Sequence, residues 1–211
     1  MTKTIDISFM ELLASKICHD LISPIGAIAN GVEFMEEMGG ADDEITDLIK
    51  FSALQASAKL QAYRMAYGAG GGDVSIKPED VHKSFGKFIE LDKKITQDWD
   101  PHGSLGPEER SAGFSKMVLC ALLLSVECLP KGGAIKIFAG GNNETIIRAE
   151  GNDAALKPPM DSALDQSMDL ESVEPRYVHA YMSGLLAKTY GFELKLKHEG
   201  SGFVEFLLIS P

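Results

Sequence analysis

His19 and Asp20 are the residues of this sequence whose types and positions are best suited to chemistry. A neutral imidazole supplies a nucleophile near physiological pH without a costly deprotonation. Asp20 could hydrogen-bond an imidazole nitrogen, although adjacent helical side chains point about 100° apart. Ser23 lies one helical turn after His19 and shares its face. The alternatives are an ordinary surface histidine at 19 and a solvated surface acid at 20.

These residues belong to a predicted helix that runs from about residue 12 to residue 38. An apolar seam on it repeats every seven residues, which is the spacing of a helix bundle. One heptad position holds Ala14, Leu21, Ile28 and Met35, and the other holds Cys18, Ile25 and Val32. At about 100° per residue His19 points away from the seam and toward water. Pro24 is expected to kink the helix just after His19.

A second helix is predicted from about residue 41 to residue 67, after the glycines at 39 and 40. Two long helices joined by a tight turn form an antiparallel hairpin. Two helices alone cannot bury both apolar seams, so we predict a homodimer in which two hairpins form a four-helix bundle. The hairpin brings Arg64 near the level of His19, where it could pair with Asp20 or hold a phosphoryl group. A plain surface salt bridge is the alternative for Arg64.

The glycine-rich run at residues 69–72 is typical of a linker between two domains, residues 1–68 and residues 73–211. After the linker the pattern alternates between helices and strands. Helices are predicted at 78–91, 107–129 and 174–190, and strands at 94–99, 134–139, 144–150, 192–197 and 203–209. Helices that cover one face of a mixed sheet form a sandwich. The predicted fold class is therefore α+β, a dimerising helical hairpin followed by an α/β sandwich.

Composition argues against several classes of function. Thirty-one acidic residues against 20 basic ones give a net charge of −11, and this field opposes binding to nucleic acid. The start of the chain lacks a signal pattern, and its most apolar run, residues 117–129, is too short to span a bilayer. We therefore expect a cytoplasmic protein without a membrane partner. The three cysteines fall on apolar helical stretches, which favours reduced core thiols, and the remaining histidines lack the spacing of a metal site.

The segment from His19 to Ile25, HDLISPI, resembles the phosphoacceptor box of histidine kinases, in which an acid and then a Thr/Ser/Asn–Pro pair follow the histidine. The order of hairpin and sandwich is similar to their dimerisation and ATP-binding domains. In the helix at 117–126, which resembles their N-box, Ser125 stands where the kinases have a magnesium-binding Asn. At their D-x-G-x-G box this chain has Ala149 for the adenine-reading Asp, Gly151 for the first glycine and Asp153 for the second. The resemblance implies that the fold is kept and that the ATP chemistry is lost.

This combination, over essentially the whole chain, is similar to the ChpT family of bacterial histidine phosphotransferases. The resemblance implies a dimeric phosphorelay carrier that takes a phosphoryl group from the receiver-domain aspartate of a hybrid histidine kinase onto His19. It would pass the group to the receiver-domain aspartate of response regulators. The carrier needs no cofactor of its own, and Mg²⁺ is expected in the partner receiver domain.

Receiver binding is expected on a patch of apolar, small and amide side chains beside the histidine: Ile22, Gly26, Ala29 and Asn30. Three alternatives stay open. A phosphatase acting on aspartyl phosphate could use Asp20 and Ser23, and a non-catalytic dimeric scaffold for receiver domains would not need His19. An ATP-dependent histidine kinase would need the nucleotide-binding residues that this chain has replaced.

Overall fold

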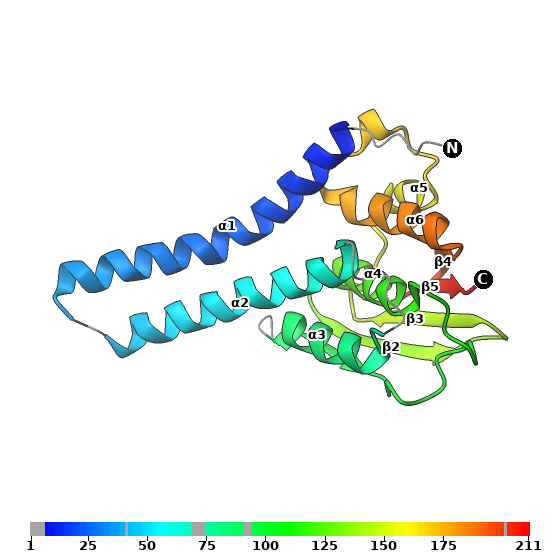
Figure 1. The fold of residues 1–211 in the computed structure, drawn as a ribbon, viewed down its shortest axis with the longest axis horizontal. Helices are drawn as coiled ribbons and strands as arrows, with labels where there is room; N and C mark the ends of the chain where they lie inside the picture. The colour runs from blue at the N-terminus through cyan, green and yellow to red at the C-terminus, as the bar shows by residue number, and fades with distance from the viewer. Residues whose placement is uncertain (1–6, 41, 69–74, 91–93, 201) are drawn as a thin grey trace.

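The computed structural model describes residues 7–40, 42–68, 75–90, 94–200 and 202–211. The predicted α+β fold class is confirmed, because a helical hairpin is followed by a mixed sheet covered by helices (Figure 1). The hairpin projects from one end of the sandwich, with its turn far from the sheet. The predicted linker at residues 69–72 lies outside the described residues.

Two long helices form the hairpin, α1 (Ile7–Met38) and α2 (Asp43–Tyr67). The carboxylate of Asp42 caps α2 by accepting hydrogen bonds from the first backbone N–H groups of the helix. Gly31 allows the two helices to approach closely, because a Cβ atom there would lie 2.7 Å from Cγ1 of Ile49. Pro24 is buried inside α1, which continues through it to Met38.

The predicted apolar seam of α1 is divided in the protomer. Its members Leu21, Ile28 and Met35 are half-buried, whereas Ile25 and Val32 are 53% and 40% exposed. Cys18 is also exposed and is not a core thiol within the protomer, whereas Cys120 and Cys128 are buried. The reason is rotation about the helix axis, since Cys18, Ile25 and Val32 repeat every seven residues on a side turned away from α2.

The sheet has five strands in the order β1-β2-β3-β5-β4. Only the pair β1 and β2 is parallel among the strands described. The strands are β1 (Ile95–Asp98), β2 (Gly133–Ala139), β3 (Glu144–Glu150), β4 (Glu193–Gly200) and β5 (Phe203–Ile209). The covering helices are α3 (Pro78–Glu90), α4 (Phe114–Glu127) and α6 (Val178–Tyr190), and the shorter α5 (Met160–Asp165) precedes α6.

Two helices of the sandwich begin later than the sequence predicts. The helix expected from residue 107 begins at Phe114, because Gly113 has a φ of 90°, which no residue inside a right-handed helix adopts. The helix expected from residue 174 begins at Val178, after the 3₁₀ turn Pro175–Tyr177. Helix α4 is almost wholly buried, as the central helix of the sandwich.

The base of the hairpin shares the hydrophobic core of the sandwich. Phe9 of α1 and Ala66 of α2 belong to the same buried cluster as the side chains of α3, α4 and the sheet. The Lys116 ammonium on α4 donates a hydrogen bond of 2.9 Å to the carbonyl oxygen of Gly68, at the end of α2. The hairpin is therefore seated on the sandwich at its base.

Helix α1 is long and apolar enough to cross a membrane, by length and composition only. Only 6% of its most apolar 18-residue window is buried. The apolar composition of α1 therefore belongs mostly to its surface.

Candidate functional site

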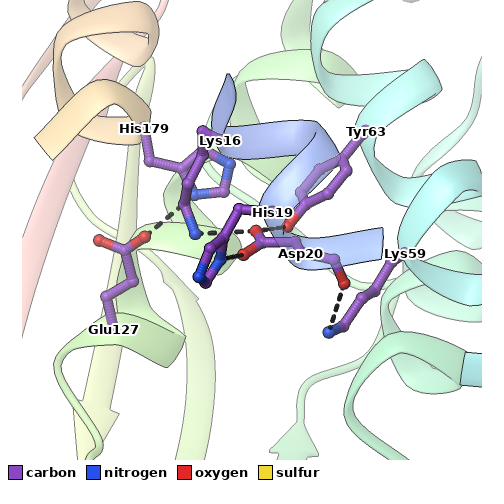
Figure 2. A network of polar contacts seen from close by, with 7 residues as sticks. All are labelled: Lys16, His19, Asp20, Lys59, Tyr63, Glu127 and His179. Carbon is purple, nitrogen blue, oxygen red and sulfur yellow. Dashed lines mark hydrogen bonds and ion pairs between the residues drawn. The ribbon is translucent and has the colours of Figure 1, made fainter. Parts of the chain in front are cut away.

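His19 lies near the middle of α1, and its side chain is 87% exposed. Its Nδ1 atom lies 3.4 Å from Oδ1 of Asp20. The other ring nitrogen, Nε2, points away from Asp20 in Figure 2. Since an ionised carboxylate can only accept hydrogen bonds, Nδ1 must carry the proton in this contact, which leaves the Nε2 lone pair free.

Asp20 is held by groups from both helices of the hairpin. Its Oδ2 atom accepts hydrogen bonds of 2.8 Å from Lys16 Nζ and 2.5 Å from Tyr63 Oη, and its backbone oxygen accepts one of 3.1 Å from Lys59 Nζ (Figure 2). Burial raises the pKa of Asp20, but the hydrogen bonds from Lys16 and Tyr63 outweigh it and bring the pKa below its usual value. The carboxylate beside His19 is therefore ionised at neutral pH.

Tyr63 reaches Asp20 from a buried position on α2. Its ring is 5% exposed and contacts the rings of Phe88, Tyr67 and His179, with centroid distances of 6.4, 6.0 and 5.8 Å. Burial and the neighbouring Asp20 carboxylate both raise the pKa of the Tyr63 hydroxyl. Tyr63 is therefore a neutral phenol that donates to Asp20 throughout the physiological range.

Arg64 does not pair with Asp20, which is one of the roles that the sequence left open for it. Arg64 is exposed, and among the described residues its guanidinium makes no ion pair. Tyr63 and Arg64 are neighbours on α2, so their side chains point about 100° apart and only one of them can face α1. The level in the hairpin was predicted correctly, but the rotation of α2 turns Tyr63 toward Asp20 instead.

The other predicted site residues surround His19 on the outer side of α1. Ser23, Ile22, Ala29 and Asn30 are exposed, Ile22 at 68%, and Gly26 is half-buried. At 100° per residue all five lie within about 80° of His19 around the helix axis. Apart from its chain neighbours and the adjacent backbone of α1, a Cβ atom at Gly26 would have no described atom within 4 Å. Nothing in the described protomer therefore requires a glycine there. These five residues and His19 thus lie together on one face of α1, centred on His19.

Internal contacts occupy the positions that correspond to the nucleotide boxes. The Ser125 hydroxyl is buried and donates to the carbonyl oxygen of Ala121 at 2.8 Å, within its own helix. Ala149 is fully buried in β3. A Cβ atom at Gly151 would lie 2.5 Å from the Gly132 carbonyl oxygen, and Asp153 forms a 2.8 Å ion pair with Lys131. These side chains serve the packing and surface of the sandwich.

The half-buried acid Glu127 and the buried base His179 form a pair beside Tyr63. His179 Nδ1 on α6 is 3.1 Å from Oε1 of Glu127 at the end of α4 (Figure 2). Burial raises the pKa of Glu127 to about 7 and lowers the pKa of His179 to about 3. Near pH 6 the folded pair is therefore predominantly neutral, whereas in the unfolded chain at least the glutamate is charged.

The wild type is expected to lose stability as pH rises because of Glu127, and the Glu127→Gln variant is expected not to show this loss. The unfolded glutamate ionises near pH 4.5, while the folded one keeps its proton to about pH 7. The wild type therefore loses stability as pH rises between these values, by on the order of 2 to 3 kcal/mol. His179 acts in the opposite direction but is present in both proteins, so it largely cancels in their difference.

Urea denaturation at pH 5, 6, 7 and 8 measures this effect. The free energy of unfolding of Glu127→Gln minus that of the wild type should increase steadily from pH 5 to about pH 7.5 and then level off. A difference that does not change with pH would mean that Glu127 titrates normally in the folded protein.

Sequence reasoning missed the groups that hold Asp20 and the pair behind them. Lys16 could have been found, since it lies four residues before Asp20 on the same helix. Tyr63 could have been weighed beside Arg64, because both fall at the level of Asp20 in an antiparallel hairpin. The Glu127–His179 pair left no signal, because its members lie 52 residues apart in different helices.

The fold and the site together define a protein that presents an exposed histidine, paired with an ionised carboxylate, on a helical hairpin seated on an α/β sandwich. The family model for the histidine phosphotransferase C-terminal domain matches residues 78–202. The protein phosphotransferase ChpT of Brucella abortus (strain 2308) is 34% identical over 194 residues, which cover 88% of each chain. The chain belongs to the histidine phosphotransferase family and is of the ChpT type.

A solved structure supports the same assignment. A 1.7 Å structure of a bacterial phosphotransferase matches this fold with a TM-score of 0.77 and 30% sequence identity, over 98% of each chain. The match therefore includes both the hairpin and the sandwich.

Proposed function

We propose that this protein is a phosphorelay carrier that transfers phosphoryl groups between receiver domains through His19. The donor is the receiver-domain aspartate of a hybrid histidine kinase, and the acceptors are the receiver-domain aspartates of response regulators. The observation that carries the proposal is the geometry of His19, which is exposed on α1 with Nδ1 against an ionised carboxylate and Nε2 directed outward. Membership of the histidine phosphotransferase family supports it.

The transfer step balances with the groups of the site. The lone pair of Nε2 attacks the phosphorus of the receiver's aspartyl phosphate, and the bond between phosphorus and the aspartate oxygen breaks. Its electron pair leaves with the receiver carboxylate, while the imidazole keeps its Nδ1 proton and becomes a phosphorylated imidazolium. The Asp20 carboxylate faces this developing positive charge. In the second transfer a carboxylate oxygen of the acceptor receiver's aspartate attacks the phosphorus, the N–P bond breaks, and its electron pair returns to Nε2.

Receiver docking is placed on the face centred on His19. Ile22 offers an exposed apolar side chain, and Gly26 and Ala29 leave room for close approach. Asn30 and Ser23 supply polar groups at the edge of this face. Mg²⁺ belongs to the receiver domain that carries the aspartate, and the carrier supplies no cofactor.

We place this protein outside the class of ATP-dependent kinases. Ser125 stands at the position of the kinase Asn and bonds within its own helix, and Ala149 stands at the position of the kinase Asp and is buried in the core. Asp153 stands at the position of a glycine and forms a surface ion pair. A net charge of −11 likewise disfavours nucleic acid as a partner.

We also propose a homodimer in the cytoplasm, with its two hairpins forming a four-helix bundle. The exposed apolar side chains Ile25 and Val32 are seven residues apart on one side of α1, as a bundle seam requires. A second copy fits this side better than lipid does, because α1 also carries the Lys16–Asp20 ion pair and the exposed His19 near its middle.

Phosphoryl transfer from a ³²P-labelled receiver domain to the full-length protein tests the proposal. An acid-labile label that appears on this protein and can be chased onto a second receiver is the expected result, since phosphohistidine is labile to acid. Rapid release of inorganic phosphate without a labelled carrier would identify an aspartyl-phosphate phosphatase instead. No effect on any receiver would leave a docking scaffold, and labelling from ATP alone would show a kinase.

A further inference from the structure

Tyr63 donates a hydrogen bond to Asp20 from a buried position, so it lies outside the exposed face centred on His19. We infer that Tyr63 is a positioning residue for phosphoryl transfer, which fixes the Asp20 carboxylate so that His19 is held with its proton on Nδ1 and its lone pair on Nε2. This inference rests on the proposed role of His19 as the acceptor. By this inference the sandwich contributes to phosphoryl transfer, because its side chains hold the Tyr63 ring in place.

The two oxygens of Asp20 have different partners. Oδ2 accepts the hydrogen bonds of Tyr63 Oη at 2.5 Å and Lys16 Nζ at 2.8 Å. Oδ1 is the oxygen that lies 3.4 Å from His19 Nδ1. Because Tyr63 and Lys16 both engage Oδ2, the carboxylate cannot turn without breaking these bonds, and Oδ1 is kept for the imidazole. The contact at 3.4 Å is long, so its formation depends on how the carboxylate is held.

Tyr63 is the firmer of the two donors. Lys16 lies on the same helix as Asp20 and ends in a flexible ammonium group with a side chain that is 22% exposed. Tyr63 is 5% exposed, and its ring packs against Phe88 of α3 and His179 of α6, which both belong to the sandwich. The hydroxyl is thus presented to α1 from a fixed ring, and its position is set by helices outside the hairpin.

The chain contains a matched control for the loss of this hydroxyl. Tyr67 lies one helical turn after Tyr63, and its ring stacks on the Tyr63 ring at a centroid distance of 6.0 Å. Its hydroxyl is also buried, but it has no hydrogen-bond partner among the described residues. Tyr67→Phe therefore removes a buried hydroxyl from the same cluster and leaves Asp20 untouched.

The first measurement is the tautomer of His19, read from the ¹⁵N chemical shifts of its imidazole in the full-length protein at a pH where the ring is neutral. The Nδ1–H form is expected to dominate in the wild type and in Tyr67→Phe. In Tyr63→Phe the fraction of this form should fall, because Oδ1 is no longer fixed beside Nδ1. Equal tautomer populations in Tyr63→Phe and the wild type would overturn the inference. This readout needs no phosphoryl transfer, and the thermal unfolding of both variants controls for general loosening.

The second measurement is single-turnover transfer from a phosphorylated receiver. At saturating receiver, Tyr63→Phe should slow transfer about 10- to 100-fold with an unchanged dissociation constant for the receiver, and Tyr67→Phe should match the wild type. Equal rates for all three proteins would contradict a positioning role while leaving the carrier function intact. A wild type that accepts no label would instead reject the proposed function, and the tautomer measurement would still judge the contact.

Discussion

Replacing His19 with alanine is expected to abolish phosphoryl acceptance and leave the folded protein intact. The proposed reaction forms its new bond to Nε2, and neighbouring groups such as Asp20 and Ser23 can orient or polarise but cannot replace this nucleophile. The His19 side chain is 87% exposed, so its loss should change the free energy of unfolding by no more than about 0.5 kcal/mol. The loss of acid-labile label should therefore be complete, whereas changes at the supporting residues should only slow transfer.

A second exposed histidine provides the matched control. His102 lies in the sandwich with a side chain that is 73% exposed, and it pairs with Glu79 far from α1 in the sequence. His102→Ala should therefore keep the rate and extent of labelling of the wild type. Label that persists in His19→Ala would have to be on another residue and would remove His19 from its assigned role.

The periodicity of the sequence predicted the parts of the site that depend on one helix. The apolar seam of α1 indicated a helix, and 100° per residue then placed His19, Ser23 and Gly26 together on its outer side. The structure places them there. Such a prediction needs only the pitch of a helix, which is the same in every protein.

The parts that depend on two elements were harder to predict, for a physical reason. The hairpin turn predicted which levels of α1 and α2 face each other, but it did not predict the rotation of α2 about its axis. Because of that rotation the residue that faces Asp20 is Tyr63, and not its neighbour Arg64. The seam of α1 likewise did not show which of its members meet α2 within the protomer, where Cys18 is exposed. The Glu127–His179 pair depends on how α4 and α6 pack, and only the three-dimensional structure brings the two together.

A change on the apolar side of α1 should separate the proposed dimer. Ile25 and Val32 are 53% and 40% exposed in the protomer and are placed in the bundle seam. In a two-fold dimer each substitution occurs twice, so Ile25→Glu with Val32→Glu introduces four carboxylates into an apolar interface. A buried, unpaired charge costs several kcal/mol, so the dissociation constant should rise more than about a thousandfold. Light scattering after size exclusion should show a dimer for the wild type and a monomer for the variant.

Phe34 distinguishes this interface from simple loss of surface apolarity. It is 53% exposed on the same helix, as exposed as Ile25, but nine residues from it and so about 180° away around the helix axis. Phe34→Glu should therefore remain a dimer. If Phe34→Glu dissociates and the Ile25/Val32 variant does not, the second copy lies on the opposite side of the hairpin. A wild type that is monomeric and binds lipid vesicles would instead show that lipid covers the apolar side of α1.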